Sequence, residues 1–458
     1  MLEIRGTQLE NIIGTAGRVL REFVDHLDNA PTVITEAPAE IIEKVSGFPG
    51  EGPGDPLELI ELARQAADVA METAGPRFLA YVPGGGDVLS AVGELLARGF
   101  NRYGSLSVGA PVLAAMEDGL LRWCADLFEL PVGSGGLLTT GGSQAMLSMV
   151  LAARERHVGE ALGDARIYVS DQANHCVAKN VKIAGFPARA LRVLPTVDGR
   201  RLDPAALADA VARDRAAGLN PFLVVANAGS TGTGDVDPLA ELGSLARKEN
   251  LWFHVDACYG GFFQLTERGR ERMRGIELAD SISLDPHKSL FLPFGTGALL
   301  VRDTAALAAA HTADTSADYF QDFDPGAVPD YADLGTELTR ENRGLRMWLP
   351  LRTHGLAAYR AALDEKLDLA AGVHRWLAAD PRFVVPHEPA LSTVVFGLRD
   401  GDDEANLAFL DRINASRRVF LSSTRLRGQV VVRMCVLSHR SHAEHVHEAL
   451  DVISAAAG

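Results

Sequence analysis

Two segments decide the fold of this chain, LWFHVDACYGG at residues 251–261 and ADSISLDPHKSLFLPFGTGALLV at residues 279–301. Each contains a short apolar run that predicts a strand, because the run is too short for a helix and ends at polar or turn-forming residues. Asp256 directly follows the first predicted strand, and Lys288 follows the second after three intervening residues. We therefore expect a carboxylate and an amine near the ends of two successive strands.

The same pattern extends outward from these segments, over residues 137–302. Short apolar runs predict strands at residues 137–140, 167–170, 222–226, 251–255, 281–284 and 297–301. Helical patterns separate several of these runs, for example at 204–217 and 238–250. Strands that alternate with helices predict an α/β fold with a mainly parallel central sheet covered by helices, and a ligand site at the carboxyl ends of the strands.

The composition of the sequence divides the chain into three parts. Residues 1–75 form an N-terminal arm, whose first clear helix begins at Asp55-Pro56, because Asp caps helices and Pro favours the first helical position. Residues 76–345 form a large domain, in which the acidic segment 314–337 predicts a mobile loop that closes over the site. Residues 346–458 form a smaller α+β domain. We expect the arm to pack against a partner subunit.

The composition also excludes several kinds of partner. The 458 residues carry a formal net charge of -16 without a basic run, which argues against nucleic acid and anionic membranes. The charged N-terminus differs from a signal peptide, and no run of roughly 18 apolar residues predicts a membrane helix. The four cysteines are scattered without CxxC spacing, so neither a metal site nor a disulfide framework is predicted. We expect a cytoplasmic protein.

Four motifs at the predicted strand ends offer groups for binding and catalysis. TTGGSQ opens a helix, so its Gly142 and Ser143 present free backbone N–H groups to a phosphate. NAGSTGTG at 227–234 offers hydroxyl groups, Asp256 offers a carboxylate, and Lys288 offers an imine-forming amine. Alone, each motif is also explained by a turn, a helix cap or a solvated charge. Together they supply what pyridoxal 5'-phosphate (PLP) needs from a protein.

These motifs resemble those of the PLP-dependent group II decarboxylases, the fold-type I family that includes aromatic amino acid, glutamate and diaminobutyrate decarboxylases. NAGSTGTGDVDPLAEL, LWFHVDACYGG and ADSISLDPHKSLFLPFGTGALLV follow one another in the family's order and spacing within residues 226–301. Weaker similarity covers residues 76–455 and includes Pro111, Glu117 and Trp123, which match a helix of the family. The resemblance implies a fold-type I fold, PLP as cofactor, and a homodimer with the site at its two-fold interface.

The resemblance also assigns cofactor contacts to individual residues. It implies that Lys288 forms an imine with PLP and that Asp256 pairs with the pyridine nitrogen. It implies further that Gly142 and Ser143 bind the phosphate and that His287 lies beside it. Lys288, Asp256 and His287 are accordingly the predicted catalytic residues within the cofactor site.

Two more residues match functional positions of the family. Ser230 matches a hydroxyl that lies near the ring oxygen of the cofactor. Tyr331, in VPDYADLGTELTR, matches the mobile-loop tyrosine that the decarboxylases use as a proton donor. The resemblance therefore implies that Tyr331 is a catalytic residue.

Several positions depart from the family pattern. The family stacks a histidine on the cofactor ring, but ungapped matching of SDQANHCVAKN puts Asn174 there, with His175 one residue later, so both remain candidates. Cys258 replaces the small residue, usually alanine, that supports the other face of the ring. Ser105 and Ser289 stand where aromatic amino acid decarboxylases carry aromatic side chains. These two serines argue against a flat aromatic substrate and favour a bulkier or more polar amino acid.

The favoured function is PLP-dependent decarboxylation of an L-amino acid, in which Tyr331 protonates the carbanion left by CO2 to give an amine. The closest alternative is capture of that carbanion by dioxygen, which couples decarboxylation to oxidative deamination and yields an aldehyde. Asn174 motivates this alternative, because some aldehyde-forming relatives also lack the ring histidine. Two more distant hypotheses are β-elimination from a cysteine-derived substrate and a non-catalytic relative that acts as a binding partner.

Overall fold

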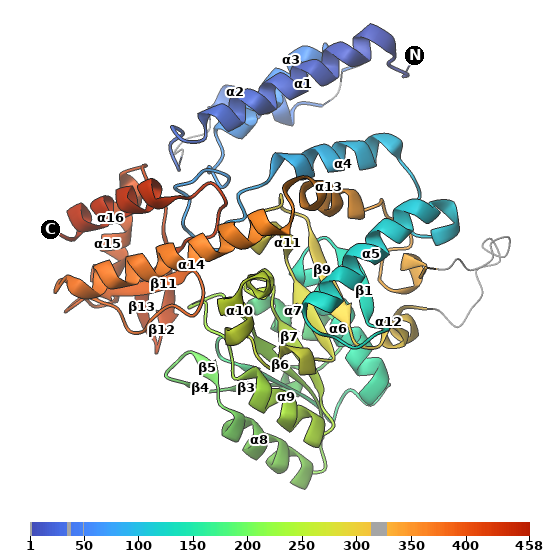
Figure 1. The fold of residues 1–458 in the computed structure, drawn as a ribbon, viewed down its shortest axis with the longest axis vertical. Coiled ribbons are helices and arrows are strands. Elements are labelled where there is room, and N and C mark those ends of the chain that lie inside the picture. The colour runs from blue at the N-terminus through green and yellow to red at the C-terminus, as the bar shows by residue number, and fades with distance from the viewer. Residues whose placement is uncertain (1, 34–37, 49, 313–327) are drawn as a thin grey trace.

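The computed structural model describes residues 2–33, 38–48, 50–312 and 328–458. Its centre is a seven-stranded sheet in the order β1-β9-β8-β7-β6-β2-β3 (Figure 1). Its strands are β1 (Gly135–Thr139), β2 (Ala165–Ser170), β3 (Leu191–Leu194), β6 (Asn220–Asn227), β7 (Trp252–Asp256), β8 (Ser281–Leu284) and β9 (Gly297–Val301). Every strand predicted from the sequence is confirmed. Strand β3 was missed, because only its last residue is buried and its apolar pattern is weak.

The direction of the strands brings the polar loops together. Strands β8, β7, β6, β2 and β3 run parallel, and β9 runs antiparallel to both β8 and β1. Neighbouring parallel strands require crossover connections, and here helices supply most of them. The carboxyl ends of β6, β7 and β8 therefore lie side by side, with Asn227 opposite Asp256 and Asp256 opposite Ser283.

Helices of the large domain cover the sheet, as the sequence predicted. They are α5 (Pro111–Leu127), α6 (Gly142–His157), α7 (His175–Ile183), α8 (Pro204–Ala216), α9 (Leu239–Lys248), α10 (Glu267–Arg272), α11 (Pro286–Ser289) and α12 (Thr304–His311). Helix α5 packs against β1 and β9, α6 packs against β8 and β9, and α9 packs against β6 and β7. Strands β7, β8 and β9 are buried along their whole length, which explains their apolar sequences.

The C-terminal part forms a smaller α+β unit, also as predicted. It contains α13 (Gly344–His354), α14 (Leu356–Ala379), α15 (Asp403–Ala415), α16 (Ala443–Ala457) and an antiparallel sheet of β10 (Phe383–Val384), β11 (Thr393–Leu398), β13 (Gln429–Cys435) and β12 (Ser422–Leu426). Met347 and Leu351 of α13 belong to the core of the large domain, and so does Leu363 of α14. Val373 of α14 belongs to the core of the small one. Helix α14 thus connects the two cores.

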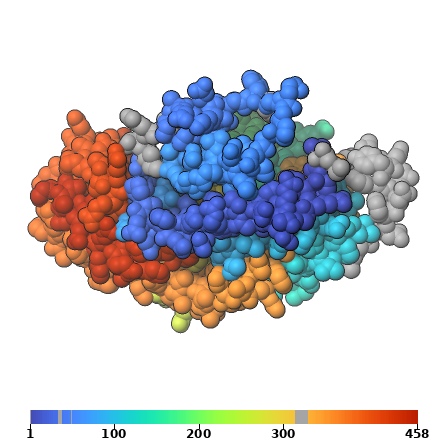
Figure 2. Space-filling view, turned by 90° about the horizontal axis from the view of Figure 1, so that it is seen from above, coloured from blue at the N-terminus to red at the C-terminus, as the bar shows by residue number. Residues whose placement is uncertain are grey.

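The N-terminal arm forms a layer of helices with little burial of its own. Its helices are α1 (Gly6–His26), α2 (Ala39–Ser46) and α3 (Pro56–Asp68), followed by α4 (Val88–Phe100). Asp55 caps α3 by accepting a hydrogen bond from the Leu57 backbone N–H, as the sequence predicted. Helix α1 was missed, because no side chain caps its N-terminus. No residue of α1, α2 or α3 is buried, and Figure 2 shows this layer lying across one face of the molecule.

Residues 314–327 of the predicted mobile loop lie outside the described residues.

Strands β4 (Thr196–Val197) and β5 (Arg201–Leu202) form a small hairpin beside the C-terminal unit. Within the described ranges, no helix is long and apolar enough to span a membrane. The same ranges contain no group of three or more His, Cys, Asp or Glu side chains arranged to hold a metal ion.

Candidate active site

A cavity of about 320 Å³ lies at the carboxyl ends of the central strands. The structure brings together seven of the residues predicted from the sequence, and these line the cavity: Gly142, Ser143, Asn174, Asp256, Cys258, His287 and Lys288. They come from loops that follow several different strands, and the sheet order makes these loops neighbours. The cavity is therefore the candidate active site.

Lys288 lies in the short helix α11, just beyond strand β8. Its Nζ is 2.9 Å from Oδ2 of Asp285, and both side chains are largely buried. Burial alone lowers the pKa of Lys288, but the negative charge of Asp285, with a smaller effect from Asp256, raises that pKa above its ordinary value. The amine is therefore held protonated in this arrangement, and it needs to lose a proton before it attacks a carbonyl group.

Asp285 joins the lysine to the start of helix α6. Its Oδ1 accepts a hydrogen bond of 2.6 Å from the backbone N–H of Gly142. Gly142 has no room for a side chain, because a Cβ there would lie 2.3 Å from the sulfur of Cys258. Glycine is therefore required at this position. The helix N-terminus binds the carboxylate of Asp285 here, as it would bind another anion.

His287 lies between the carboxylate of Asp285 and Thr296, the residue just before strand β9. Its Nδ1 lies 2.7 Å from the carbonyl oxygen of Thr296, so Nδ1 carries a proton and donates it. Its Nε2 is 3.6 Å from Oδ2 of Asp285. Burial lowers the pKa of His287 more than the nearby carboxylate raises it. The neutral imidazole is therefore the favoured form.

Asp256 ends strand β7 at the floor of the cavity and is 7% exposed. Its Oδ1 accepts hydrogen bonds from the backbone N–H of Cys258, at 3.1 Å, and from the hydroxyl of Ser283, at 3.4 Å. Both donors hold the same oxygen. This arrangement leaves Oδ2 for a group inside the cavity.

Two thiols line the cavity beside Asp256. Burial raises the pKa of the Cys258 thiol well above its ordinary value, and burial likewise raises the pKa of Cys176 to about 12. Both cysteines are therefore neutral and act as small apolar side chains. This fits the predicted role of Cys258 as a support for one face of a ring.

The structure separates the two candidates for the other ring face. Asn174 lines the cavity and caps helix α7: its side-chain oxygen accepts from Cys176 N, and its amide donates to Thr231 Oγ1 at 2.8 Å. His175 is the first residue of α7, is exposed, and does not line the cavity. In this chain the amide of Asn174, fixed by two hydrogen bonds, is the side chain that faces the cavity.

Besides His175, two predicted residues are not brought to the cavity. Ser230 is 1% exposed, and its hydroxyl pairs with Thr233 Oγ1 at 2.9 Å, inside the loop rather than toward the cavity. Tyr331 begins a short helix, Tyr331–Asp333, and is 2% exposed. The guanidinium of Arg340 lies over its ring, 4.7 Å from the ring centre, and burial raises the pKa of its hydroxyl. Tyr331 thus packs inside its own chain.

Sequence reasoning assigned no individual role to the other residues of the cavity, although most lie in motifs that it singled out: Thr140, Gly141, Gln144, Cys176, Asn227, Gly229, Thr231, Tyr259 and Asp285. Asp285 had a clear signal, because it immediately precedes Pro286 in the motif that contains Lys288. Thr231 follows Ser230 in the loop that was singled out, so only the choice between neighbouring hydroxyls was missed. The sequence pattern around Tyr259 predicts an aromatic side chain in the hydrophobic core, and no neighbouring residue indicates that it lines a cavity.

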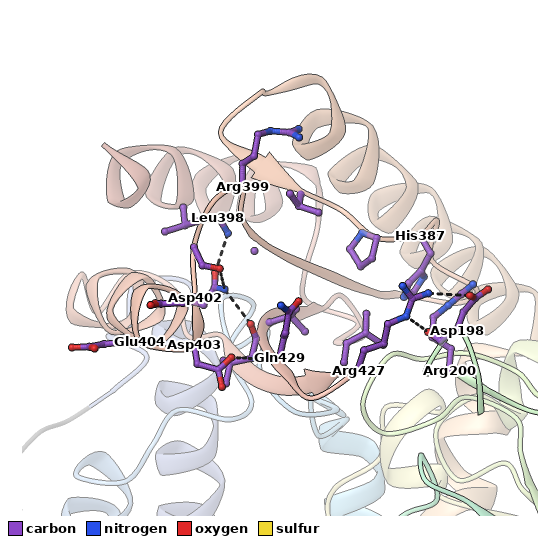
Figure 3. Close-up of a pocket in the computed structure, with 18 residues that line it drawn as sticks. Asp198, Arg200, His387, Leu398, Arg399, Asp402, Asp403, Glu404, Arg427 and Gln429 are labelled. Atoms are coloured by element: carbon purple, nitrogen blue, oxygen red, sulfur yellow. Dashed lines mark hydrogen bonds and ion pairs between the residues drawn. The ribbon is translucent and has the colours of Figure 1, made fainter. Parts of the chain in front are cut away.

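A second and larger cavity, of about 780 Å³, lies between the β4–β5 hairpin and the C-terminal sheet (Figure 3). It contains none of the predicted site residues. Two of its arginines are paired: Arg200 lies 2.9 Å from Oδ1 of Asp235, and Arg427 lies 2.9 Å from Oδ1 of Asp198. These two ion pairs satisfy the charges of Arg200 and Arg427 locally.

The residues of the smaller cavity fit PLP. Lys288 provides an amine for the aldehyde, Asp256 presents a free carboxylate oxygen, and the first turn of α6 provides backbone N–H groups and the positive end of a helix dipole. The neutral thiol of Cys258 and the amide of Asn174 line the remaining space. These are the groups that hold the aldehyde, ring nitrogen, phosphate and ring of this cofactor.

Comparisons with known proteins agree with this fit. Residues 49–399 match the family described as "Pyridoxal-dependent decarboxylase conserved domain". The chain is 30% identical to an aromatic-L-amino-acid decarboxylase of Bacillus atrophaeus, over 100% of this chain and 97% of that one. It is 33% identical to a phenylacetaldehyde synthase of Arabidopsis thaliana, over 82% and 81% of the two chains.

Solved structures lead to the same family. The crystal structure of Oryza sativa TDC with PLP and tryptamine superposes with a TM-score of 0.94 and 25% identity, and the match covers 100% of this chain and 99% of that one. Mouse CSAD superposes with a TM-score of 0.89 at 22% identity, a likeness of fold, over 98% of each chain. The chain belongs to the group II pyridoxal-dependent decarboxylase family, and it is a PLP-dependent amino acid decarboxylase.

Proposed function

We propose that this decarboxylase converts an L-amino acid into the corresponding amine with Lys288 as the residue that holds the cofactor covalently. The observation that carries the proposal is the joint placement of Lys288, Asp256 and the N-terminus of α6 around one cavity. Lys288 is the one lysine that lines this cavity in the part of the chain that the structure describes. A residue with this placement can bind the aldehyde of PLP and later exchange with a substrate amine.

The protein groups have separate tasks in this proposal. PLP, when bound, supplies the electron sink for the bond that breaks at the α-carbon. The backbone N–H groups at Gly142 and Ser143 would bind its phosphate, with the Gly142 N–H exchanging its bond to Asp285 for one to the phosphate. Asp256 would keep a proton on its ring nitrogen. His287, which is neutral and bonded to the carbonyl of Thr296, would lie beside the phosphate end. The proton donor predicted from the sequence, Tyr331, stays a prediction, since it lies outside the cavity of its own chain.

The side chain of the substrate is a second part of the proposal. The cavity is lined mostly by small and polar residues, including Thr140, Gln144 and Thr231, which supports a polar or bulkier side chain over a flat ring. Ser105 and Ser289, on which the sequence argument depended, are both buried outside the cavity of this chain. The names of the relatives favour aromatic amino acids instead. A panel of L-amino acids, with CO2 release as readout, distinguishes a polar or bulkier substrate from an aromatic one.

Formation of an aldehyde is the alternative that a specific observation favours. Asn174, not a histidine, faces the cavity, and one of the relatives is a phenylacetaldehyde synthase. The test measures CO2, amine, aldehyde, ammonia, peroxide and oxygen uptake together. Amine equal to CO2 without oxygen uptake supports simple decarboxylation, whereas aldehyde and oxygen uptake in proportion to CO2 overturn it. β-Elimination gains no support from the residues of the cavity, and we do not propose it.

A homodimer is the third part of the proposal. Leu9, Ile13, Leu20 and Phe23 form a stripe on one side of α1 at helical spacing, and each is 36% exposed or more. Such a stripe needs a partner surface, and a second copy of this chain is the occupant that the family resemblance implies. Light scattering should give twice the chain mass for the wild type. Ile13→Asp should reduce that mass to one chain, and Asp25→Ala on the same helix should not.

A further inference from the structure

A buried histidine lies directly behind the carboxylate of Asp256. His254 is fully buried and stands two residues before Asp256 on strand β7, so both side chains point to the same face of the sheet. In the pairing of β7 with β8, Ser281 is opposite His254 and Ser283 is opposite Asp256. The strand register therefore places two hydroxyl groups beside the imidazole and the carboxylate.

Four hydrogen bonds join these groups into one chain. The indole N–H of Trp252 donates to Ser281 Oγ at 2.8 Å, and Ser281 Oγ is 2.8 Å from His254 Nδ1. On the other side of the ring, His254 Nε2 is 3.2 Å from Ser283 Oγ. Ser283 then donates to Oδ1 of Asp256 at 3.4 Å. The chain starts at a group that only donates and ends at a carboxylate that only accepts.

Both ring nitrogens of His254 lie within hydrogen-bond distance of a hydroxyl that can donate or accept, and the direction of this chain favours a proton on Nε2. Because Ser283 gives its own hydrogen to Asp256, its oxygen is free to accept, and the donor facing it is His254 Nε2–H. A neutral imidazole has one N–H, so Nδ1 accepts the hydrogen of Ser281. Burial lowers the pKa of His254 to about 3, which keeps the ring neutral over the ordinary pH range. Every donor in the chain thus has an acceptor.

We propose that His254 is a positioning residue, which fixes the hydroxyl of Ser283 on Oδ1 of Asp256 and so turns Oδ2 of Asp256 toward the cavity. The inference rests on the proposed role of Asp256 toward the ring nitrogen of the cofactor. With Ser283 and the N–H of Cys258 both on Oδ1, the carboxylate loses its freedom to rotate. The plane of the carboxylate is then set before the cofactor binds.

Three variants test the proposal in the PLP-loaded enzyme. His254→Leu and Ser283→Ala each break the chain next to Asp256, whereas His254→Gln keeps an N–H donor near the position of Nε2. We expect His254→Leu and Ser283→Ala to lower kcat by about tenfold with little change in KM, because a misplaced catalytic group costs rate. His254→Gln should recover most of the loss. Ser281→Ala, on the far side of the ring, is the matched control and should have a smaller effect.

A spectroscopic readout separates positioning from a purely structural role. A weaker contact with Asp256 removes positive charge from the cofactor ring, so the pH at which its visible absorption titrates should rise by about one unit in His254→Leu. If this variant only unfolds more easily in urea, with kcat and the absorption titration unchanged, the proposal is wrong. If His254→Leu does not fold, unchanged kcat and titration in Ser283→Ala overturn it equally.

Two further measurements distinguish a failure of the positioning role of His254 from a failure of the proposed role of Asp256. If Asp256→Asn leaves the absorption titration and the rate unchanged, the proposed role of Asp256 fails, whatever the variants of His254 do. The tautomer of His254 is tested without turnover, by nitrogen NMR of the enzyme labelled with ¹⁵N-histidine, with His254→Gln used to assign the signal. A neutral ring with the proton on Nε2 at pH 7 supports the proposal, and a proton on Nδ1, or a cationic ring, overturns it.

Discussion

Two buried clusters of charge in the large domain differ in what their charges face. Around Lys288, the lysine and Asp285 pair at 2.9 Å beside an open cavity. Around Tyr331, Arg340 pairs with Glu117 at 2.6 Å, and both side chains are 1% exposed. The first pair can be exchanged for bonds to a ligand, whereas the second is closed off from solvent. Burial of charge alone therefore does not mark the active site; access to a cavity does.

Glu117, which the family resemblance had singled out, has a structural role in the second cluster, the one around Tyr331. Arg340 also donates to the carbonyl oxygen of Leu138 in β1, and its backbone N–H donates to Ser105 Oγ at 2.9 Å. These bonds tie the segment after Tyr331 to helix α5 and strand β1. Glu117 thus holds the chain in place, whereas Lys288 is the residue that we propose acts on the ligand.

The largest effect should come from Lys288→Ala, which removes the reactive member of the first cluster. We expect loss of the cofactor that borohydride can trap, and a fall in rate of roughly 10³-fold or more, because no other lysine lines the cavity in the described ranges. Absorption spectra and turnover assays measure both. Lys179→Ala, an exposed lysine on α7, is the control and should behave as the wild type. Retained trappable cofactor in Lys288→Ala would show that another amine carries it.

The second cluster should respond in stability. Glu117→Gln leaves the guanidinium of Arg340 buried without its counter-charge, which should lower the free energy of unfolding by about 3–5 kcal/mol. Urea denaturation of the PLP-loaded enzyme measures this change. Asp118→Asn is the matched control, since Asp118 pairs at 2.8 Å with the exposed Arg122, and a surface pair contributes about 1 kcal/mol or less. Equal losses in both variants would mean that burial of the Glu117 pair has no special weight.

The two clusters also show which parts of the molecule a sequence reveals. Six of the seven central strands, the placement of Asp256 and Lys288 at strand ends, and the start of helix α6 beside the cavity were each predicted from a short local pattern. The position of Tyr331 depends on bonds such as Arg340 to Glu117, which are 223 residues apart in the sequence. No local pattern encodes such a contact. The placement of Asn174, rather than His175, at the cavity likewise depends on a helix cap and on Thr231, 57 residues away.

A smaller effect should follow from Asp285→Asn, which keeps the shape of the first cluster and removes its negative charge. Asp285 raises the pKa of Lys288, so its loss lowers that pKa and increases the neutral fraction of the amine at a given pH. The rate at which PLP attaches to the apoenzyme should therefore reach its plateau at a pH lower by about one unit or more. Stopped-flow absorption over a pH series measures this shift. Asp171→Asn, an exposed carboxylate beyond β2, is the control, and an unshifted profile for Asp285→Asn would contradict the argument.

The smallest effect should come from Tyr331→Phe, which tests whether Tyr331 only packs in the second cluster or also acts at an active site. Its buried hydroxyl has no hydrogen-bond partner among the described residues, so loss of the oxygen should change the free energy of unfolding by less than about 1 kcal/mol. Tyr259→Phe is the matched comparison and should cost more, because the Tyr259 hydroxyl bonds to Ser392 Oγ at 2.8 Å and to the Ser392 backbone N–H at 2.9 Å. The position of Tyr331 in its own chain also predicts an unchanged ratio of amine to aldehyde. A shift toward aldehyde would instead support the proton-donor role that the sequence implied, and would require Tyr331 to reach an active site from outside the described arrangement.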